Sequence, residues 1–153
     1  MRQRAAWALS QIFVIGAAGF DGRRDKDTEA YATYYDIFVR NAFGAYGTVM
    51  REVTASPLMG EYLTYAANGA PTNGKTFANE NYARELMQLF SIGHWELNVD
   101  GTPVLDQAKQ RVETYTSDDI MAFSRVWTGL KNRAMRPNIA REVSLFGSIN
   151  ANG

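Results

Sequence analysis

Apolar residues recur every three or four positions along much of the chain, and this spacing places side chains on one face of an α-helix. Residues 2–15 are apolar around most of a helical wheel, which predicts a largely buried helix. Residues 29–43 predict a second helix, and Asp27 or Thr28 in the charged loop before it is expected to cap it. Its apolar and mostly aromatic stripe is expected to face the core and comprises Tyr31, Tyr34, Tyr35, Phe38, Val39, Ala42 and Phe43.

Three shorter elements follow along the chain. A helix is predicted at residues 47–54, and another begins after Ser56, which suits the N-cap, with Pro57 at the first helical position. The clearest helical pattern spans residues 80–92 and stops at Gly93. Its apolar side comprises Tyr82, Ala83, Leu86, Met87, Leu89 and Phe90.

The pattern changes after Gly93. Two short extended runs flank an Asp-Gly pair, which predicts a small β-hairpin near residues 95–105. Thr116 then suits the N-cap of a last helix, with Asp119 in place for a near-match to a capping box. This helix is expected to end at Gly129, and no internal repeat is visible. Its buried face would comprise Ile120, Phe123, Val126 and Trp127, with Tyr115 packed opposite Ile120.

These patterns predict a mainly α-helical fold. We expect a single domain of about five to seven helices over residues 1–130, with the small hairpin near 95–105, followed by an irregular, basic tail over residues 131–153. The chain has 153 residues, of which 46% are hydrophobic and 12% aromatic, and this is enough for a packed core.

Charge and composition narrow the range of partners. Sixteen basic residues balance sixteen acidic ones, and the basic tail lacks interleaved aromatics, so we expect no nucleic acid. The apolar run at residues 5–20 is shorter than a bilayer span, so we expect no membrane span, and it lacks a signal-peptide cleavage pattern. The chain has no cysteine, and one histidine, His94, cannot build a conventional zinc site. We expect no metal and no cofactor.

Residues 69–76 read GAPTNGKT and match the pattern of a phosphate-binding loop, with Gly69, Gly74, Lys75 and Thr76 in the defining positions. Such a loop follows a β-strand and opens a helix whose N-terminus faces the phosphates. Here a short helix is predicted before Gly69, and the next helical pattern begins only near residue 80. We therefore interpret the match as accidental, with nucleotide binding kept as an alternative.

Polar residues crowd the start of the predicted 80–92 helix. Glu80, Arg84 and Glu85, with Asp119 from the last helix, are candidate catalytic residues of a hydrolase-like site. Glu80 and Arg84 are also spaced for an ion pair on the helix surface. Two hypotheses stay open: a helical interaction or scaffold module, favoured by the aromatic core and the balanced charge, or part of an enzyme.

Three stretches resemble one family in their order and spacing. They are RQRAAWALSQIFVIG at residues 2–16, NENYARELMQLFSIGHWELNVDGTP at residues 79–103 and YTSDDIMAFSRVWTGL at residues 115–130. Over residues 2–140 the chain is similar to the family called domain of unknown function 1800. Its members are longer on both sides, so the resemblance implies that the chain is a fragment or a truncated relative.

The resemblance implies no activity and no catalytic residue, because the family has none established. Its members often look exported, and many are encoded beside proteins of a second family, domain of unknown function 1501. A secreted or cell-envelope role is implied. We expect the partner to be either the remainder of a longer chain of its own or a protein of that second family.

Overall fold

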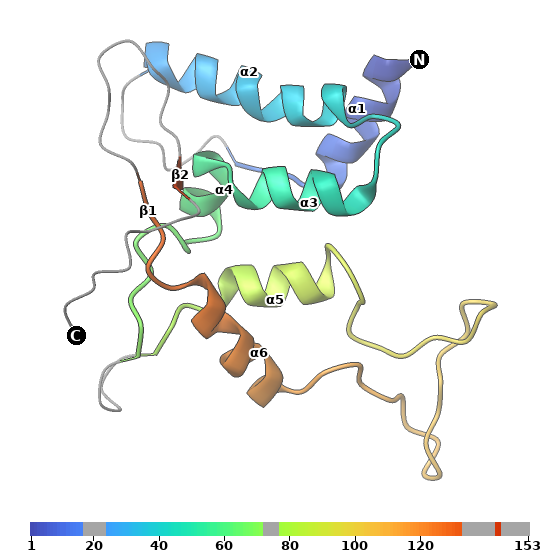
Figure 1. Ribbon diagram of the computed structural model, residues 1–153. Helices are drawn as coiled ribbons and strands as arrows, with labels where there is room; N and C mark the ends of the chain where they lie inside the picture. The colour runs from blue at the N-terminus through green and yellow to red at the C-terminus, as the bar shows by residue number, and fades with distance from the viewer. Residues whose placement is uncertain (17–23, 72–76, 133–142, 145–153) are drawn as a thin grey trace.

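The computed structural model describes residues 1–16, 24–71, 77–132 and 143–144, and its fold is mainly helical (Figure 1). This confirms the predicted fold class. Within these ranges the α-helices are α1 (Arg2–Ile12), α2 (Arg24–Arg40), α3 (Tyr46–Thr54), α4 (Pro57–Tyr62), α5 (Asn81–Gln88) and α6 (Ser117–Ser124), and α6 continues into the 3-10 helix η1 (Arg125–Trp127).

The main core lies where α1 to α4 face one another. Phe13, just after α1, packs its ring against Phe38 of α2 and against Phe90, which follows α5. Tyr34 meets Phe38 edge to face and donates its hydroxyl hydrogen to the Phe13 carbonyl at 2.7 Å. All four side chains are buried, so this part of the aromatic stripe packs as its spacing predicts.

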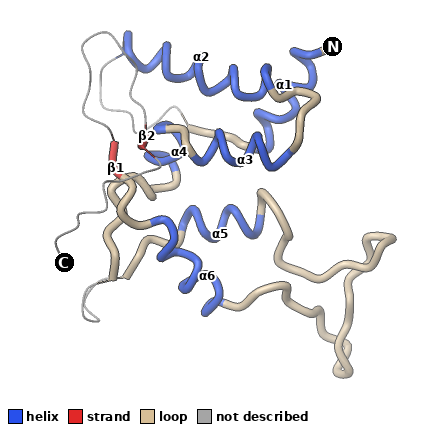
Figure 2. The backbone as a smooth tube through the Cα atoms, in the orientation of Figure 1, coloured by secondary structure: helices blue, strands red, loops and turns tan. Residues whose placement is uncertain are grey.

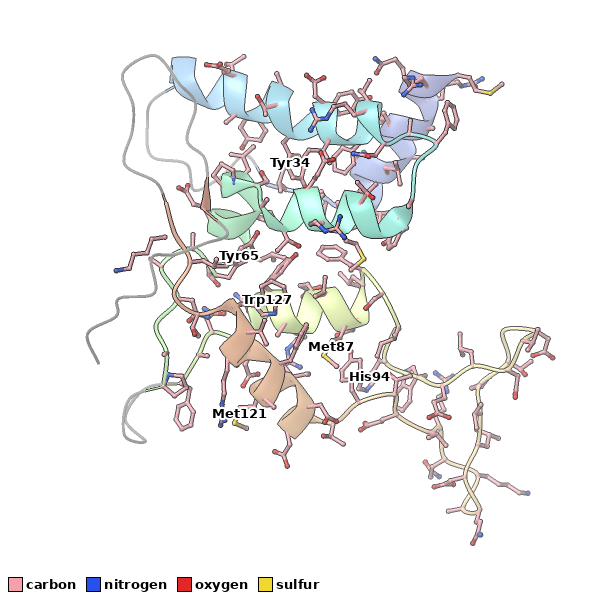
Figure 3. The ribbon with its side chains drawn as sticks, viewed as in Figure 1. Tyr34, Tyr65, Met87, His94, Met121 and Trp127 are labelled. Carbon is pink, nitrogen blue, oxygen red and sulfur yellow. The ribbon has the colours of Figure 1, made fainter. Side chains whose placement is uncertain are left out.

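A second group of aromatic side chains joins α5 to the rest of the molecule. Tyr82 of α5 is buried with its ring centroid 4.2 Å from that of Tyr65 and 4.8 Å from that of Trp127. Figure 3 shows Tyr65 and Trp127 between the upper helices and the α5–α6 pair. The helices α5 and α6 therefore pack together and are tied to α4 through these rings.

The start of α6 has the predicted capping box. The Thr116 hydroxyl accepts a hydrogen bond from the Asp119 N–H, and the Asp119 carboxylate accepts one from the Thr116 N–H at 2.8 Å. Tyr115 and Ile120 are both buried in one apolar cluster, as a hydrophobic staple requires. Gly129 ends the segment at φ +80°, in the left-handed region that glycine favours.

The prediction that the first helix is largely buried is wrong. Of the residues in α1, Ala6 is buried, whereas Trp7 and Ile12 are exposed. The reason is geometric, because α1 packs mainly along α2, and the side chains of Trp7 and Ile12 stay exposed.

Several predicted boundaries also shift. α2 already begins at Arg24, so Asp27 and Thr28 lie inside the helix and do not cap it; no Gly or Pro interrupts this stretch of the sequence. α5 ends at Gln88, where the helical pattern is broken because the Phe90 N–H bonds to the Glu85 carbonyl, five residues back, and not to the Leu86 carbonyl. Side chains expected on buried faces but found exposed are Phe43 and Leu89, beyond the ends of α2 and α5, and Val126, in η1 where the helical period tightens.

Two short strands lie within the predicted tail. β1 (Lys131–Asn132) pairs antiparallel with β2 (Val143–Ser144). The rest of residues 131–153 lies outside the described residues, and the irregular basic tail stays a prediction. The same holds for the boundary at residue 130.

Residues 93–116 leave the helices as an arm, which Figures 1 and 2 show extending away to the lower right. Its first part is the hairpin predicted near residues 95–105, in which Leu97 pairs with Pro103 and the turn passes through Gly101 at φ +82°. Two further bridges close the arm, Leu105 with Arg111 and Trp95 with Glu113.

A ring of backbone hydrogen bonds holds the arm together. The Glu96 N–H donates to the Val112 carbonyl at 2.9 Å, the Val112 N–H to the Val104 carbonyl at 3.1 Å, and the Val104 N–H to the Glu96 carbonyl at 2.9 Å. The arm thus consists of three successive segments with one backbone pattern, although no repeat is visible in the side chains. The segments are 93–100, 101–108 and 109–116, and each begins at a positive φ, at Gly93, Gly101 and Lys109.

Candidate functional site

The polar residues at the start of α5 form a network that positions the helix. The Asn68 side chain accepts a hydrogen bond from the Asn79 N–H at 2.9 Å, and its amide group donates to the Asn79 and Trp127 carbonyls. The Asn79 side chain accepts from the Asn81 N–H, and the Asn81 side chain donates to the Thr64 hydroxyl. These asparagines therefore join α5 to the loop after α4 and to η1.

Glu80 and Arg84, two of the candidate catalytic residues, pair with each other. The guanidinium of Arg84 lies 2.9 Å from the Glu80 carboxylate, and their side chains are 44% and 36% exposed. A surface pair of this kind contributes little to stability, typically below about 1 kcal/mol. The hydrolase hypothesis requires these groups to meet other polar side chains around a substrate, and here each meets the other at the helix surface.

Glu85, the third candidate, lies near Tyr115 at the base of the arm. Burial raises the pKa of the Tyr115 hydroxyl, while the charge of Arg84 lowers it and the charges of Glu85 and Glu113 raise it. Within the described residues this buried hydroxyl has no hydrogen-bond partner. The sequence did not predict this group, because Glu85 and Tyr115 are thirty residues apart, with most of the arm between them.

The single histidine lies at the same base, where Figure 3 shows His94 as the chain leaves α5. Its Nε2 is 3.5 Å from a carboxylate oxygen of Glu113, and its ring meets those of Trp95 and Tyr115 edge to face. The arm therefore has an anchored root, with packed rings and a polar contact between its two ends.

Asp119, the last catalytic candidate, is hydrogen-bonded to Thr116 within the cap of its own helix. Hydrogen bonds from the Thr116 N–H and hydroxyl hold the pKa of its carboxyl below the usual value. The carboxylate is thereby ionised at neutral pH and serves the capping box of α6.

The phosphate-loop pattern begins at Gly69, in an irregular segment after α4. Helix α4 precedes it, α5 begins only at Asn81, and Gly74, Lys75 and Thr76 lie outside the described residues. No parallel sheet is present in the part of the chain that the structure describes. The flanking elements therefore differ from the strand and helix that a phosphate loop joins, and the accidental match stays a prediction.

Metal-ligand clusters and membrane-spanning helices are not found within the described ranges. No group of three or more His, Asp or Glu side chains is placed there to share a metal ion. None of the described helices has the length and apolar character needed to cross a membrane.

The arm extends away from the helices (Figure 1), and several of its apolar side chains are exposed. Leu97 is 61% exposed, Leu105 is 52% exposed and Val99 is fully exposed. The ring of hydrogen bonds fixes the backbone that carries them, so these side chains have little backbone freedom to turn inward. An ordered segment that exposes apolar groups is a candidate interaction site. Sequence reasoning predicted the first hairpin but not the exposure of its leucine and valine.

Comparison with known proteins gives one match. Residues 1–146 match the family model described as "Protein of unknown function (DUF1800)", which is nearly the whole chain. No curated protein matches the chain. No solved structure matches it either.

Proposed function

We propose that this chain, which belongs to the DUF1800 family of proteins of unknown function, is a helical interaction module that binds another protein through its arm. The observation that carries the proposal is the exposure of Leu97, Val99 and Leu105 on a hydrogen-bonded scaffold outside the core. Burying one such side chain in an interface contributes roughly 1.5–3 kcal/mol. Two or three of them together would form the apolar centre of a larger contact.

The small contribution of the arm to the core supports this proposal. The main core of α1 to α4 is formed without any residue of the arm, and the arm contributes Tyr115 to the smaller cluster at α5 and α6. Since the outer part of the arm adds little to the core, stability of the helices does not explain its apolar side chains. A partner that covers them does.

The partner we propose is a protein of the domain of unknown function 1501 family, at the cell envelope or outside the cell. Support comes from the neighbourhood of the two families' genes and from the exported character of many DUF1800 proteins. In a longer chain, its own remainder would be the competing occupant of the arm.

The test is a binding titration between this chain and a DUF1501-type protein from the same organism. Changing both Leu97 and Val99 to Asp should weaken binding at least about tenfold, because the interface loses two apolar contacts and gains two desolvated charges. The control is Val126→Asp on η1, where the apolar residue is as exposed as Leu97. Equal affinities for the wild type and the double variant would rule out the arm as the binding site.

A further inference from the structure

The arm has one outward-facing backbone edge in each of its three segments. In a strand, successive residues direct their N–H and C=O groups to opposite sides. The ring uses both backbone groups of Glu96, so those of its neighbours Trp95 and Leu97 face outward. Among the described residues, neither Trp95 nor Leu97 donates or accepts a backbone hydrogen bond, and the same is true of Val99. This edge is therefore open to pairing.

The other two edges are protected in the ways that exposed strands usually are. The second segment carries Pro103, which has no N–H to donate. The third carries the charged Arg111 and Glu113, which oppose pairing with an apolar strand. On the first edge the outward residues end in Leu97 and Val99, both exposed and apolar. Leu105 on the second edge is also exposed with an unpaired N–H, but Pro103 interrupts the donors of that edge, so among the described residues the first edge alone of the arm carries two successive outward-facing apolar residues with free N–H groups.

We propose that the edge at residues 95–99 binds an extended segment of the partner protein, which adds a strand to the arm. This inference rests on the proposed function and specifies how the arm makes its contact. Leu97 exchanges backbone hydrogen bonds with the incoming strand, and its side chain and that of Val99 pack against apolar residues of that strand.

The charge of the arm selects the kind of strand. The arm has four acidic residues, two of them Glu96 and Asp100 beside the open edge, against two basic ones. A second copy of this chain, paired through the same edge, would place like charges opposite each other, which is unfavourable. The occupant is therefore a segment in which apolar residues alternate with Lys or Arg.

Hydrogen exchange in the complex with the DUF1501-type protein tests the pairing directly. In the free chain the N–H groups of Trp95, Leu97 and Val99 should exchange fast, since no described group accepts from them. In the complex the Leu97 amide should be protected at least about a hundredfold if it bonds to a partner strand. Unchanged exchange at Leu97 in a complex that does form overturns the inference.

Two substitutions at one position separate the backbone from the side chain. Leu97→Ala keeps the N–H and should weaken binding about tenfold through the lost apolar contact. Leu97→Pro also removes the N–H and should weaken binding by about a further tenfold. Protection of the Glu96, Val104 and Val112 amides in the variant verifies that the ring is intact. If the variant loses the ring, strand addition is judged only from the exchange of the Leu97 amide in the wild-type complex.

A charge substitution tests the nature of the strand. The Glu96 side chain makes no hydrogen bond or ion pair within the described residues, so Glu96→Lys changes the charge of the edge alone. It should weaken binding about tenfold at low salt and less at high salt. Tighter binding by this variant would contradict a partner strand that carries Lys or Arg. A dimer of the chain that Leu97→Pro dissociates would contradict it as well.

The experiments distinguish the arm as the binding site from strand addition as the mode of binding. If neither the Asp double variant nor Leu97→Pro changes the affinity, the arm is not the binding site and the proposed function fails. If the Asp variant weakens binding while Leu97→Pro equals Leu97→Ala and the Leu97 amide stays unprotected, only strand addition fails.

Discussion

Three tyrosine hydroxyls lie inside the helical core, and each has a hydrogen-bond partner. Tyr34 donates to the Phe13 carbonyl and Tyr65 to the Thr54 carbonyl, both at 2.7 Å. The Tyr82 hydroxyl lies 2.5 Å from that of Thr54. Because a neutral hydroxyl can be buried with one partner and a phenolate cannot, these residues oppose ionisation.

The buried tyrosines predict alkaline unfolding. Burial raises the pKa of Tyr82 to about 12, although its hydrogen bond with Thr54 lowers it, and burial raises the pKa values of Tyr34 and Tyr65 well above 10.0. The neutral hydroxyls therefore contribute stability that is fully present below pH 10.0 and is lost as the pH rises through about 12. Circular dichroism and tyrosinate absorbance should change together over this range.

A conservative substitution provides the control. Tyr82→Phe should cost about 1 kcal/mol at neutral pH, because it removes the hydrogen bond between the Tyr82 and Thr54 hydroxyls, while Thr54 keeps its bond to the Met50 carbonyl. It should also lose less stability above pH 10.0 than the wild type does. Ionisation of all eight tyrosines in one step, with the helices intact, would contradict the role of burial.

At the scale of elements, the three segments of the arm reveal a strained position. Gly93 and Gly101 start the first two segments in the left-handed region, and Lys109 starts the third at φ +60°. A residue with a Cβ atom is less stable in this region than glycine by roughly 1–2 kcal/mol. Of the three equivalent positions in the arm, the one at Lys109 is therefore the least stable in its backbone conformation.

We expect Lys109→Gly to stabilise the arm by about 1 kcal/mol, less the entropy that glycine adds to the unfolded chain. The measurement is slower amide exchange at Val104 and Val112, whose N–H groups belong to the ring. Lys109→Ala is the matched control, since it removes the same charge and keeps the strain. Equal exchange in both variants would show that the backbone conformation carries no cost.

For the whole molecule, the uncovered surface of α1 is the main consequence of the packing. Trp7 is 62% and Ile12 is 45% exposed, and Val14 beyond the helix is 52% exposed. The hydrophobic effect favours covering such side chains. Nothing among the described residues does so.

We therefore expect the chain to self-associate through α1. Changing Trp7 and Ile12 to Lys should shift sedimentation toward the monomer, by removing apolar area and adding like charges. The control is Ala32→Lys, which adds a charge at an exposed position of α2. A monomer at all concentrations in the wild type, or association that the double variant retains, would contradict this expectation.

The sequence by itself determined the helical elements and the family. Helical spacing located α3 to α6 to within a few residues, the Thr116 and Asp119 pair identified the cap of α6, and the family resemblance is confirmed. These features depend on residues close together in the chain, where backbone geometry relates spacing directly to a face or a cap.

Tertiary structure alone decided which apolar surfaces are covered and which groups meet. The pattern of α1 is that of a buried helix, yet its exposure depends on what packs against it. The charge of Glu85 acts on the Tyr115 hydroxyl, and His94 lies 3.5 Å from Glu113, although both pairs are far apart in the chain. The threefold pattern of the arm lies in backbone hydrogen bonds, which segments of different sequence can form. No repeat in the sequence therefore predicts it.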